Sequence, residues 1–163
     1  MTVSKGRGAA ALTGVALALA LGAATPAAAC DVPRGAGGYA QAIVQHTNGW
    51  RARIGAPRVS PDAALTRAAQ AHACEMARRG VMSHRGANGS GPGDRARAAG
   101  FRWNYVAENV AYGQRGPDQV SVAWMNSPGH RANMLDRRAR RIGVAVAMAG
   151  GRPYWAMVLA APR

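Results

Sequence analysis

The sequence lacks an apolar run long enough to cross a membrane. Its longest, from Ala9 to Ala24, has 16 residues, whereas a membrane-spanning helix needs about 20. Lys5 and Arg7 precede this run, and three small residues, Ala27-Ala28-Ala29, follow it. A basic start, a short apolar run and a small-residue cleavage site are together typical of a secretory signal peptide. We therefore predict that residues 1–29 are a signal peptide, that the protein is secreted, and that no transmembrane segment remains after cleavage.

Cysteine is also scarce, since Cys30 and Cys74 are the two in the chain and allow one bridge at most. In an exported chain an even number of cysteines indicates pairing, so we expect a disulfide from Cys30 to Cys74. It would close a loop of about 45 residues and stabilise the fold by up to roughly 4 kcal/mol. The alternative is a buried Cys74 with a free or lipid-anchored Cys30. Lipidation is disfavoured because Ala27 stands where a lipobox has a bulky aliphatic residue.

Acidic residues are few, and aromatic residues do not accompany the basic ones. The chain has 163 residues, and without the first 29 it keeps 134, with 19 Arg, no Lys and 7 Asp or Glu, a net charge of about +12. Such a charge favours anionic partners. The densest basic segment, Arg137 to Arg141, has no interleaved aromatic residues of the kind on which single-stranded nucleic acids stack. We expect no specific nucleic-acid partner and interpret most of these arginines as a solvated surface.

The length fits one domain with one core, which we place at residues 39–163 after a Gly-rich lead at 30–38. Hydrophobic spacing predicts a helix over 39–53 and another that Ser60-Pro61-Asp62 begins, with Ser60 as its cap. Alternation predicts a strand over 105–113 and a hairpin over 142–159, with a helix between them that ends at Pro128. This order predicts an α+β fold in which helices cover an antiparallel sheet. We expect a monomer.

Three polar side chains are candidates for one site. His130 follows a turn forced by Ser127-Pro128-Gly129, His84 lies in a polar loop, and Glu108 shares one strand face with two valines. A carboxylate on an apolar face needs a partner, because its burial alone costs several kcal/mol. Two imidazoles and a carboxylate suit a divalent ion such as zinc with water in the fourth position, and they suit proton transfer equally. We interpret His72, on an apolar helix stripe, as a hydrogen-bonded core residue.

Five segments of the chain, in order, carry a family resemblance: 71–77 (AHACEMA), 83–84 (SH), 107–113 (AENVAYG), 124–135 (WMNSPGHRANML) and 142–144 (IGV). Together they resemble the CAP superfamily, which comprises cysteine-rich secretory proteins, antigen five and pathogenesis-related proteins and is also named for its SCP domain. The similarity extends from about residue 39 to residue 161. It is greatest to the short bacterial branch, in which a secreted domain stands alone after a signal peptide.

The resemblance implies an α-β-α sandwich with a cleft in which two His and two acidic residues bind zinc or another divalent ion. In this sequence the matching ligands are His84, Glu108 and His130. Ser127 stands at the fourth position, where relatives often have Glu, so we expect weak, water-completed metal binding. The family implies a binding module for an apolar small molecule or a cell-envelope component, without a shared reaction. Candidate binding residues in the matching segments are Asn109, Ser127 and Asn133.

Two alternatives stay open. In a hydrolase, Ser127, His130 and Glu108 would be nucleophile, base and orienting carboxylate, or a metal would activate water. Ser127 precedes a proline, however, and is as well explained as a turn residue. In the second alternative the protein is a surface protein whose arginines bind anionic polymers. The aromatic residues available for an apolar cleft, although core packing explains most of them, are Phe101, Trp103, Tyr105, Tyr112 and Trp155.

Overall fold

A computed structural model describes residues 1–2 and 30–163 of the chain, so the predicted signal peptide and its cleavage site lie outside the described residues. The helices are α1 (Ala36–Arg53), α2 (Ala63–Arg79), α3 (Pro92–Ala98), α4 (Pro117–Asn126) and α5 (Pro128–Leu135). The strands are β1 (Ser60–Pro61), β2 (Trp103–Tyr112), β3 (Arg141–Ala149) and β4 (Arg152–Pro162). None of the described helices is both long and apolar enough to span a membrane.

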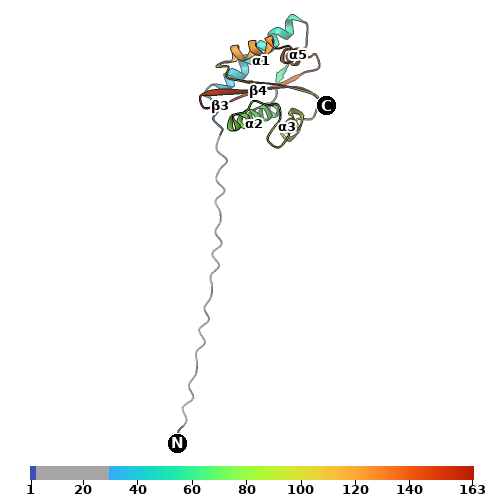
Figure 1. Cartoon of the computed structure of the whole chain (residues 1–163). Helices are drawn as coiled ribbons and strands as arrows, with labels where there is room; N and C mark the ends of the chain where they lie inside the picture. Colours follow the sequence, from blue (N-terminus) through green and yellow to red (C-terminus); the bar gives the residue numbers. More distant parts are fainter. Residues whose placement is uncertain (3–29) are drawn as a thin grey trace.

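The helices form two layers around one sheet, which confirms the predicted α+β sandwich. Helices α2 and α3 cover one face, and α1 and α5, together with α4, cover the other (Figure 1). Each face has its own cluster of buried apolar side chains, one built on α2 and the other on α1 and α4. Strand β4 is buried from Pro153 to Ala161, because helices cover it on both faces and strands flank it on both sides. It is the centre of the core.

The sheet is mixed rather than wholly antiparallel as predicted. Its strand order is β1-β3-β4-β2, and the three long strands are antiparallel to their neighbours. The two-residue strand β1 pairs in parallel with β3, with Ser60 opposite Arg141. At the other side of the sheet, β2 pairs with β4 alone and is therefore an edge strand.

Helix α2 begins two residues later than predicted, because Asp62 and not Ser60 is its cap. The Asp62 carboxylate accepts hydrogen bonds from the backbone N–H groups of Ala64 (2.8 Å) and Leu65 (3.1 Å). A carboxylate at this position also meets the positive end of the helix dipole. Ser60 is left outside the helix and is free to pair with β3.

Gly143 allows helix α2 to pack directly against β3. A Cβ at this position would lie 2.2 Å from the carbonyl carbon of Leu65, a distance at which the helix backbone would have to move. The close approach brings Leu65, Ala69 and Ala73 into full burial against the sheet. This contact therefore sets the distance between the sheet and α2, the helix that carries His72.

Ser127 alone separates α4 from α5. Helix α4 ends at Asn126, which confirms the predicted break before Pro128. The segment that follows is helical, whereas Ser127-Pro128-Gly129 predicted a turn. Proline suits the first position of a helix, since its fixed φ is helical and its missing N–H has no partner there in any case. His130 consequently lies in the first turn of α5.

Candidate functional site

Glu108 lies in the middle of the edge strand β2 and is 4% exposed. Val106 and Val110, two residues to either side, pack in the cluster on the α2 face, as the predicted alternation requires. The carboxylate thus faces the layer of α2 and α3, away from α1. Its position is the one that the sequence indicated, on an apolar face where it needs partners.

Those partners are Arg95 in α3 and His84 in the loop after α2. Arg95 donates from Nη2 to Glu108 Oε2 at 2.7 Å, and the Nδ1 of His84 lies 3.0 Å from Oε1. Arg95 also donates to the carbonyls of Ser90 (2.7 Å) and His84 (3.1 Å), so it ties the loop to the strand. The apolar strand face predicted a partner for Glu108, but the sequence does not indicate that this partner is Arg95.

The ring of His84 is oriented by this hydrogen bond. The carboxylate can only accept, so Nδ1 carries the proton and donates. The pKa of His84 is raised, chiefly by that hydrogen bond and against the opposing effect of burial. The side chain is 56% exposed, and within the described part of the chain Nε2 has no hydrogen-bond partner. His84 therefore presents its Nε2 outward from a fixed ring.

His130 belongs to α5, in the opposite layer. Burial lowers the pKa of His130, and the positive charge of His84 lowers it further. The first turn of α5 is fastened to β2, because Asn109 donates to the His130 carbonyl at 3.0 Å. Asn133 donates in turn to the Asn109 amide oxygen at 2.9 Å. Asn109 and Asn133 position His130, and their role as ligand-binding residues stays a prediction.

Side chains from α4 and α5 also bind the backbone of the edge strand. Asn133 donates to the carbonyl of Glu108 at 3.1 Å, and Trp124 donates from its indole N–H to the carbonyl of Val110, also at 3.1 Å. These two carbonyls belong to alternate residues of β2. The side of the strand that faces away from β4 is thereby joined to the helices.

His72 is a core residue, as predicted. It is 1% exposed, and its Nε2 lies 2.7 Å from the carbonyl of Ser83. A carbonyl can only accept, so Nε2 carries the proton. Desolvation lowers the pKa of His72 and so favours its neutral form, and its Nε2 lies 3.8 Å from Glu108 Oε1. Through this hydrogen bond to Ser83, His72 holds the loop that carries His84, and its own ring is buried.

The geometry fits a metal only in part. Both oxygens of Glu108 are engaged, one by Arg95 and the other by His84, so this carboxylate does not fit the role of direct ligand. In residues 30–163 no three side chains of His, Cys, Asp or Glu come together as a metal-holding group. Of the three predicted ligands, His84 and His130 therefore remain candidates.

Ser127 is the single residue between α4 and α5. It precedes α5 with extended backbone angles and caps neither helix with its side chain. No hydrogen bond joins Ser127 to His130 in the described chain. The nucleophile-and-base pair of the hydrolase alternative is not assembled in this structure.

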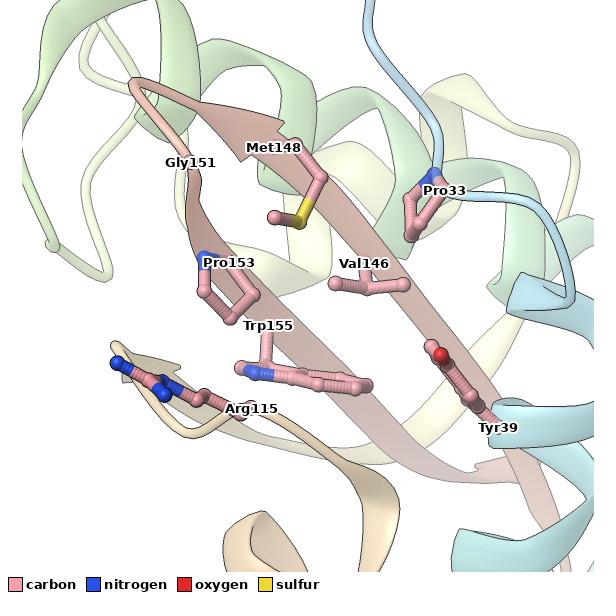
Figure 2. Close-up of a pocket in the computed structure, with 8 residues that line it drawn as sticks. All are labelled: Pro33, Tyr39, Arg115, Val146, Met148, Gly151, Pro153 and Trp155. Atoms are coloured by element: carbon pink, nitrogen blue, oxygen red, sulfur yellow. The ribbon is translucent and has the colours of Figure 1, made fainter.

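The five aromatic residues available for an apolar cleft do not converge on one. Phe101 is buried under α2, and Trp103 packs beside it with its N–H bound to the carbonyl of Gly93 at 2.9 Å. Trp155 lies on the opposite face, where it forms the floor of a hollow of about 190 Å³ (Figure 2). Tyr39, Met148 and Arg115 stand around this floor, and Pro33 of the N-terminal lead closes one side.

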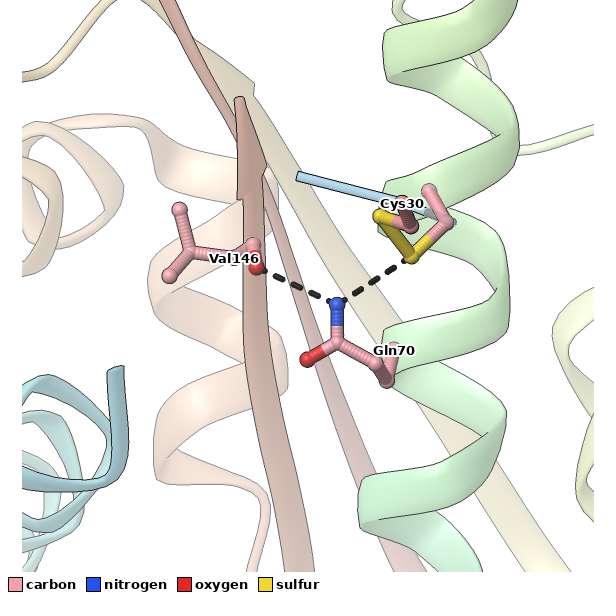
Figure 3. Close-up of a disulfide and its surroundings, with 4 residues drawn as sticks. Cys30, Gln70 and Val146 are labelled. Carbon is pink, nitrogen blue, oxygen red and sulfur yellow. Dashed lines mark hydrogen bonds between the residues drawn. A yellow bond between two sulfur atoms is a disulfide. The ribbon is translucent and has the colours of Figure 1, made fainter. Parts of the chain in front are cut away.

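The predicted disulfide holds that lead in place. Cys30 is bonded to Cys74 in α2, with Cα atoms 5.4 Å apart. Beside the bridge, the amide of Gln70 donates to Cys74 Sγ (3.3 Å) and to the carbonyl of Val146 (3.1 Å) (Figure 3). Asp31 then pairs with Met148 of β3. The wall of the hollow that contains Pro33 is therefore fixed both to α2 and to the sheet.

Comparisons with known proteins agree with this architecture. Residues 44–160 match the family model of CAP, the cysteine-rich secretory protein family. The uncharacterized protein YkwD of Bacillus subtilis (strain 168) is 31% identical over 120 residues, which make up 74% of this chain and 47% of YkwD. The chain thus spans about half the length of this curated relative.

Two solved structures share the fold. An outer surface protein from Borrelia burgdorferi superposes with a TM-score of 0.70 at 18% identity, over 76% of this chain and 92% of that one. An extracellular protein containing an SCP domain from Bacillus anthracis str. Ames gives 0.69 at 24% identity, over 77% of this chain and 41% of that one. At these identities the likeness concerns the fold alone.

Proposed function

This chain belongs to the CAP family of cysteine-rich secretory proteins, and we propose that it is a secreted binding module whose His84 and His130 hold a divalent cation such as zinc. One observation carries the metal proposal, the 3.0 Å hydrogen bond between His84 Nδ1 and Glu108 Oε1. It fixes the ring and leaves Nε2 as the ligating nitrogen. A carboxylate behind a histidine is the usual partner that orients a metal-binding imidazole.

The protonation of the two histidines favours weak metal binding. Imidazole nitrogens must be unprotonated to bind a metal, and burial lowers the pKa of His130 and so favours its neutral form. The raised pKa of His84 has the opposite effect, because the ion must compete with a proton there. Arg95 also neutralises Glu108. Two imidazoles with water completing the coordination form the site that we propose.

The proposal includes a second ligand, an apolar molecule or a cell-envelope component. It is supported by a mainly apolar hollow of about 340 Å³ between α1 and the edge of the sheet, where Ala40, Val44, Ile142 and Val144 contribute to the lining. The Cys30–Cys74 disulfide supports export, since such bonds persist in oxidising compartments.

A zinc titration by calorimetry at neutral pH tests the metal proposal. We expect one equivalent to bind wild type, and no site binding in His84→Ala or His130→Ala. His46→Ala is the matched control, because His46 lies in α1 and bonds to Ser121 in α4. Its binding should equal that of wild type. Binding should also fade below about pH 6, where the imidazoles take up protons.

Glu108→Gln separates an orienting carboxylate from a direct ligand. We expect zinc affinity to fall by about tenfold, the lower range for loss of a partner that orients a ligand. Complete loss in Glu108→Gln would instead make Glu108 a ligand. Binding that is indifferent to both histidine substitutions would refute the site.

A further inference from the structure

The topology of the sheet gathers arginines at one of its ends. The starts of β1, β2 and β3 lie at the same end, because Ser60 is opposite Arg141 and Trp103 is opposite Pro162, the last residue of β4. Arg58 precedes β1, Arg102 precedes β2, and Arg141 opens β3. With neighbouring strands about 4.8 Å apart, these three side chains span roughly 14 Å across the sheet.

The loop between α5 and β3 adds three more arginines to this end. We call the whole set the arginine end, and it consists of Arg58, Arg102, Arg137, Arg138, Arg140 and Arg141, all exposed. Two carboxylates of the described chain lie beside it, and of these only Asp136 pairs with one of its arginines. Asp62 caps α2, and Asp136 is bound by Arg138, whose hydrogen bond lowers the pKa of Asp136 to about 2. The arginine end is therefore strongly cationic.

The loop is held rigid from inside by Arg51. This side chain is fully buried and donates to the carbonyls of Met134 (2.7 Å), Asp136 (3.0 Å) and Ala139 (3.1 Å). It places a further positive charge beneath the loop. The loop backbone thus has a fixed path although it carries no regular structure.

Two of the exposed guanidinium groups are also fixed. Arg138 donates from Nε (3.0 Å) and Nη2 (2.7 Å) to Asp136 and lies 4.1 Å over the ring of Tyr105. Arg140 donates from Nη1 to carbonyls of the loop. Both line an open groove of about 480 Å³ that Asn104, Tyr105 and Pro162 also line. In the described chain, Nη2 of Arg140 has no hydrogen-bond partner and is available to a ligand.

Guanidinium groups that are already positioned match phosphate groups, because their N–H donors form a fork that binds two oxygens at once. Nucleic acid is disfavoured by the aromatic residues at this end. Arg138 lies over Tyr105, and Arg97 lies over Trp103 at 4.6 Å, so each ring has one face occupied by a guanidinium where a base would stack. We propose that the arginine end binds a linear, base-free polymer of phosphate groups, such as a polyphosphate or a polyol phosphate.

Two triple variants of equal charge test this proposal. Arg58→Gln/Arg102→Gln/Arg141→Gln removes three side chains of the arginine end that form no side-chain hydrogen bond in the described chain. Arg34→Gln/Arg78→Gln/Arg115→Gln removes three exposed arginines at the opposite, hairpin end of the sheet, beside Met148. Both variants lose the same net charge, and circular dichroism melting would verify that both fold.

The measurement is binding of fluorescent inorganic polyphosphate to the full mature chain over a range of salt concentrations. We expect affinity to fall steeply with salt, with a slope of about −0.7 per phosphate contact, as counterion release requires. The arginine-end variant should bind at least about tenfold more weakly, with a slope smaller by about 2, and the hairpin-end variant less than about threefold more weakly. Equal losses in both variants, or binding indifferent to salt, would overturn the proposal.

A competition with oligothymidylate of equal charge identifies the polymer class. We expect polyphosphate to compete at least as well as the oligonucleotide. A clear preference for oligothymidylate would show that bases are recognised and would replace the base-free polymer with a nucleic acid. The result is independent of the metal site, because none of the substituted residues contacts His84 or His130.

Discussion

The guanidinium of Arg95 lies 2.7 Å from the carboxylate of Glu108, with their side chains 9% and 1% exposed. This buried ion pair joins α3 to the edge strand β2. It engages one oxygen of Glu108, while the other oxygen accepts the hydrogen bond that orients His84. The metal site that we propose therefore uses the two imidazoles, and the ion pair supports the residues around it.

Removing one member of the pair should destabilise the fold strongly. Arg95→Met leaves a buried carboxylate without its main partner, a change that costs about 3–5 kcal/mol in comparable ion pairs. Urea unfolding at neutral pH measures the loss. The double variant Arg95→Met/Glu108→Gln removes the uncompensated charge and should regain part of that stability. A loss below about 1 kcal/mol in the single variant would mean that water reaches Glu108.

The raised pKa of His84 predicts a pH dependence of stability. The folded state holds this proton more tightly than the unfolded state, so the stabilisation is fully present below the unfolded pKa of about 6.5 and is lost as the pH rises through the folded pKa. His84→Gln should therefore cost more unfolding free energy near pH 5.5 than near pH 8.5. Urea titrations at the two pH values provide the comparison.

The same comparison in a Glu108→Gln background is the control. The hydrogen bond to Glu108 is the largest cause of the raised pKa of His84, so the pH-dependent cost of His84→Gln should vanish there. If the cost persists, another group raises the pKa. The lowered pKa values of His72 and His130 act in the opposite direction, with stability lost as the pH falls.

The disulfide should stabilise the fold mainly because it lowers the conformational entropy of the unfolded chain. Cys30→Ser/Cys74→Ser frees a segment of 44 residues and should lower the free energy of unfolding by up to roughly 4 kcal/mol. Wild type reduced with dithiothreitol should unfold at the same urea concentration as the double variant. A difference between the two midpoints would mean that the serine side chains change the stability in addition to the loss of the disulfide bond.

Gly143 should tolerate no side chain. Gly143→Ala places a methyl group 2.2 Å from the backbone of Leu65, and overpacking of this kind costs about 1–3 kcal/mol or more. Gly49→Ala in α1 is the matched control, because a Cβ there meets no atom within 4 Å. The control should stabilise the protein by about 0.5–1 kcal/mol, since alanine is the better helix former. Thermal unfolding of both variants tests the pair.

The sequence predicted the parts of the fold that local patterns determine. Alternation in β2 placed Glu108 on the correct face, and the apolar stripe of α2 identified His72 as a core residue. The pattern did not determine which arginine meets Glu108, because nineteen arginines follow residue 29 and only tertiary packing brings α3 against β2.

Two local errors have physical causes. Ser60 and Asp62 are both good helix caps, and the pairing of Ser60 with β3 decided between them in favour of Asp62. The prediction that a helix ends before Pro128 was correct. The same proline begins α5, a helix that Asn133 joins to β2. Core packing was expected to explain most of the aromatic residues, and the sequence does not show that Phe101 and Trp155 lie on opposite faces of the sheet.

The hydrogen bonds to the carbonyls of Glu108 and Val110 have a consequence beyond the site. An edge strand with open carbonyls is a template on which a second molecule can add a strand, which is a common start of aggregation. Asn133 and Trp124 occupy these two acceptors. The side chains that fasten α4 and α5 to β2 therefore also block intermolecular strand addition along the middle of the strand.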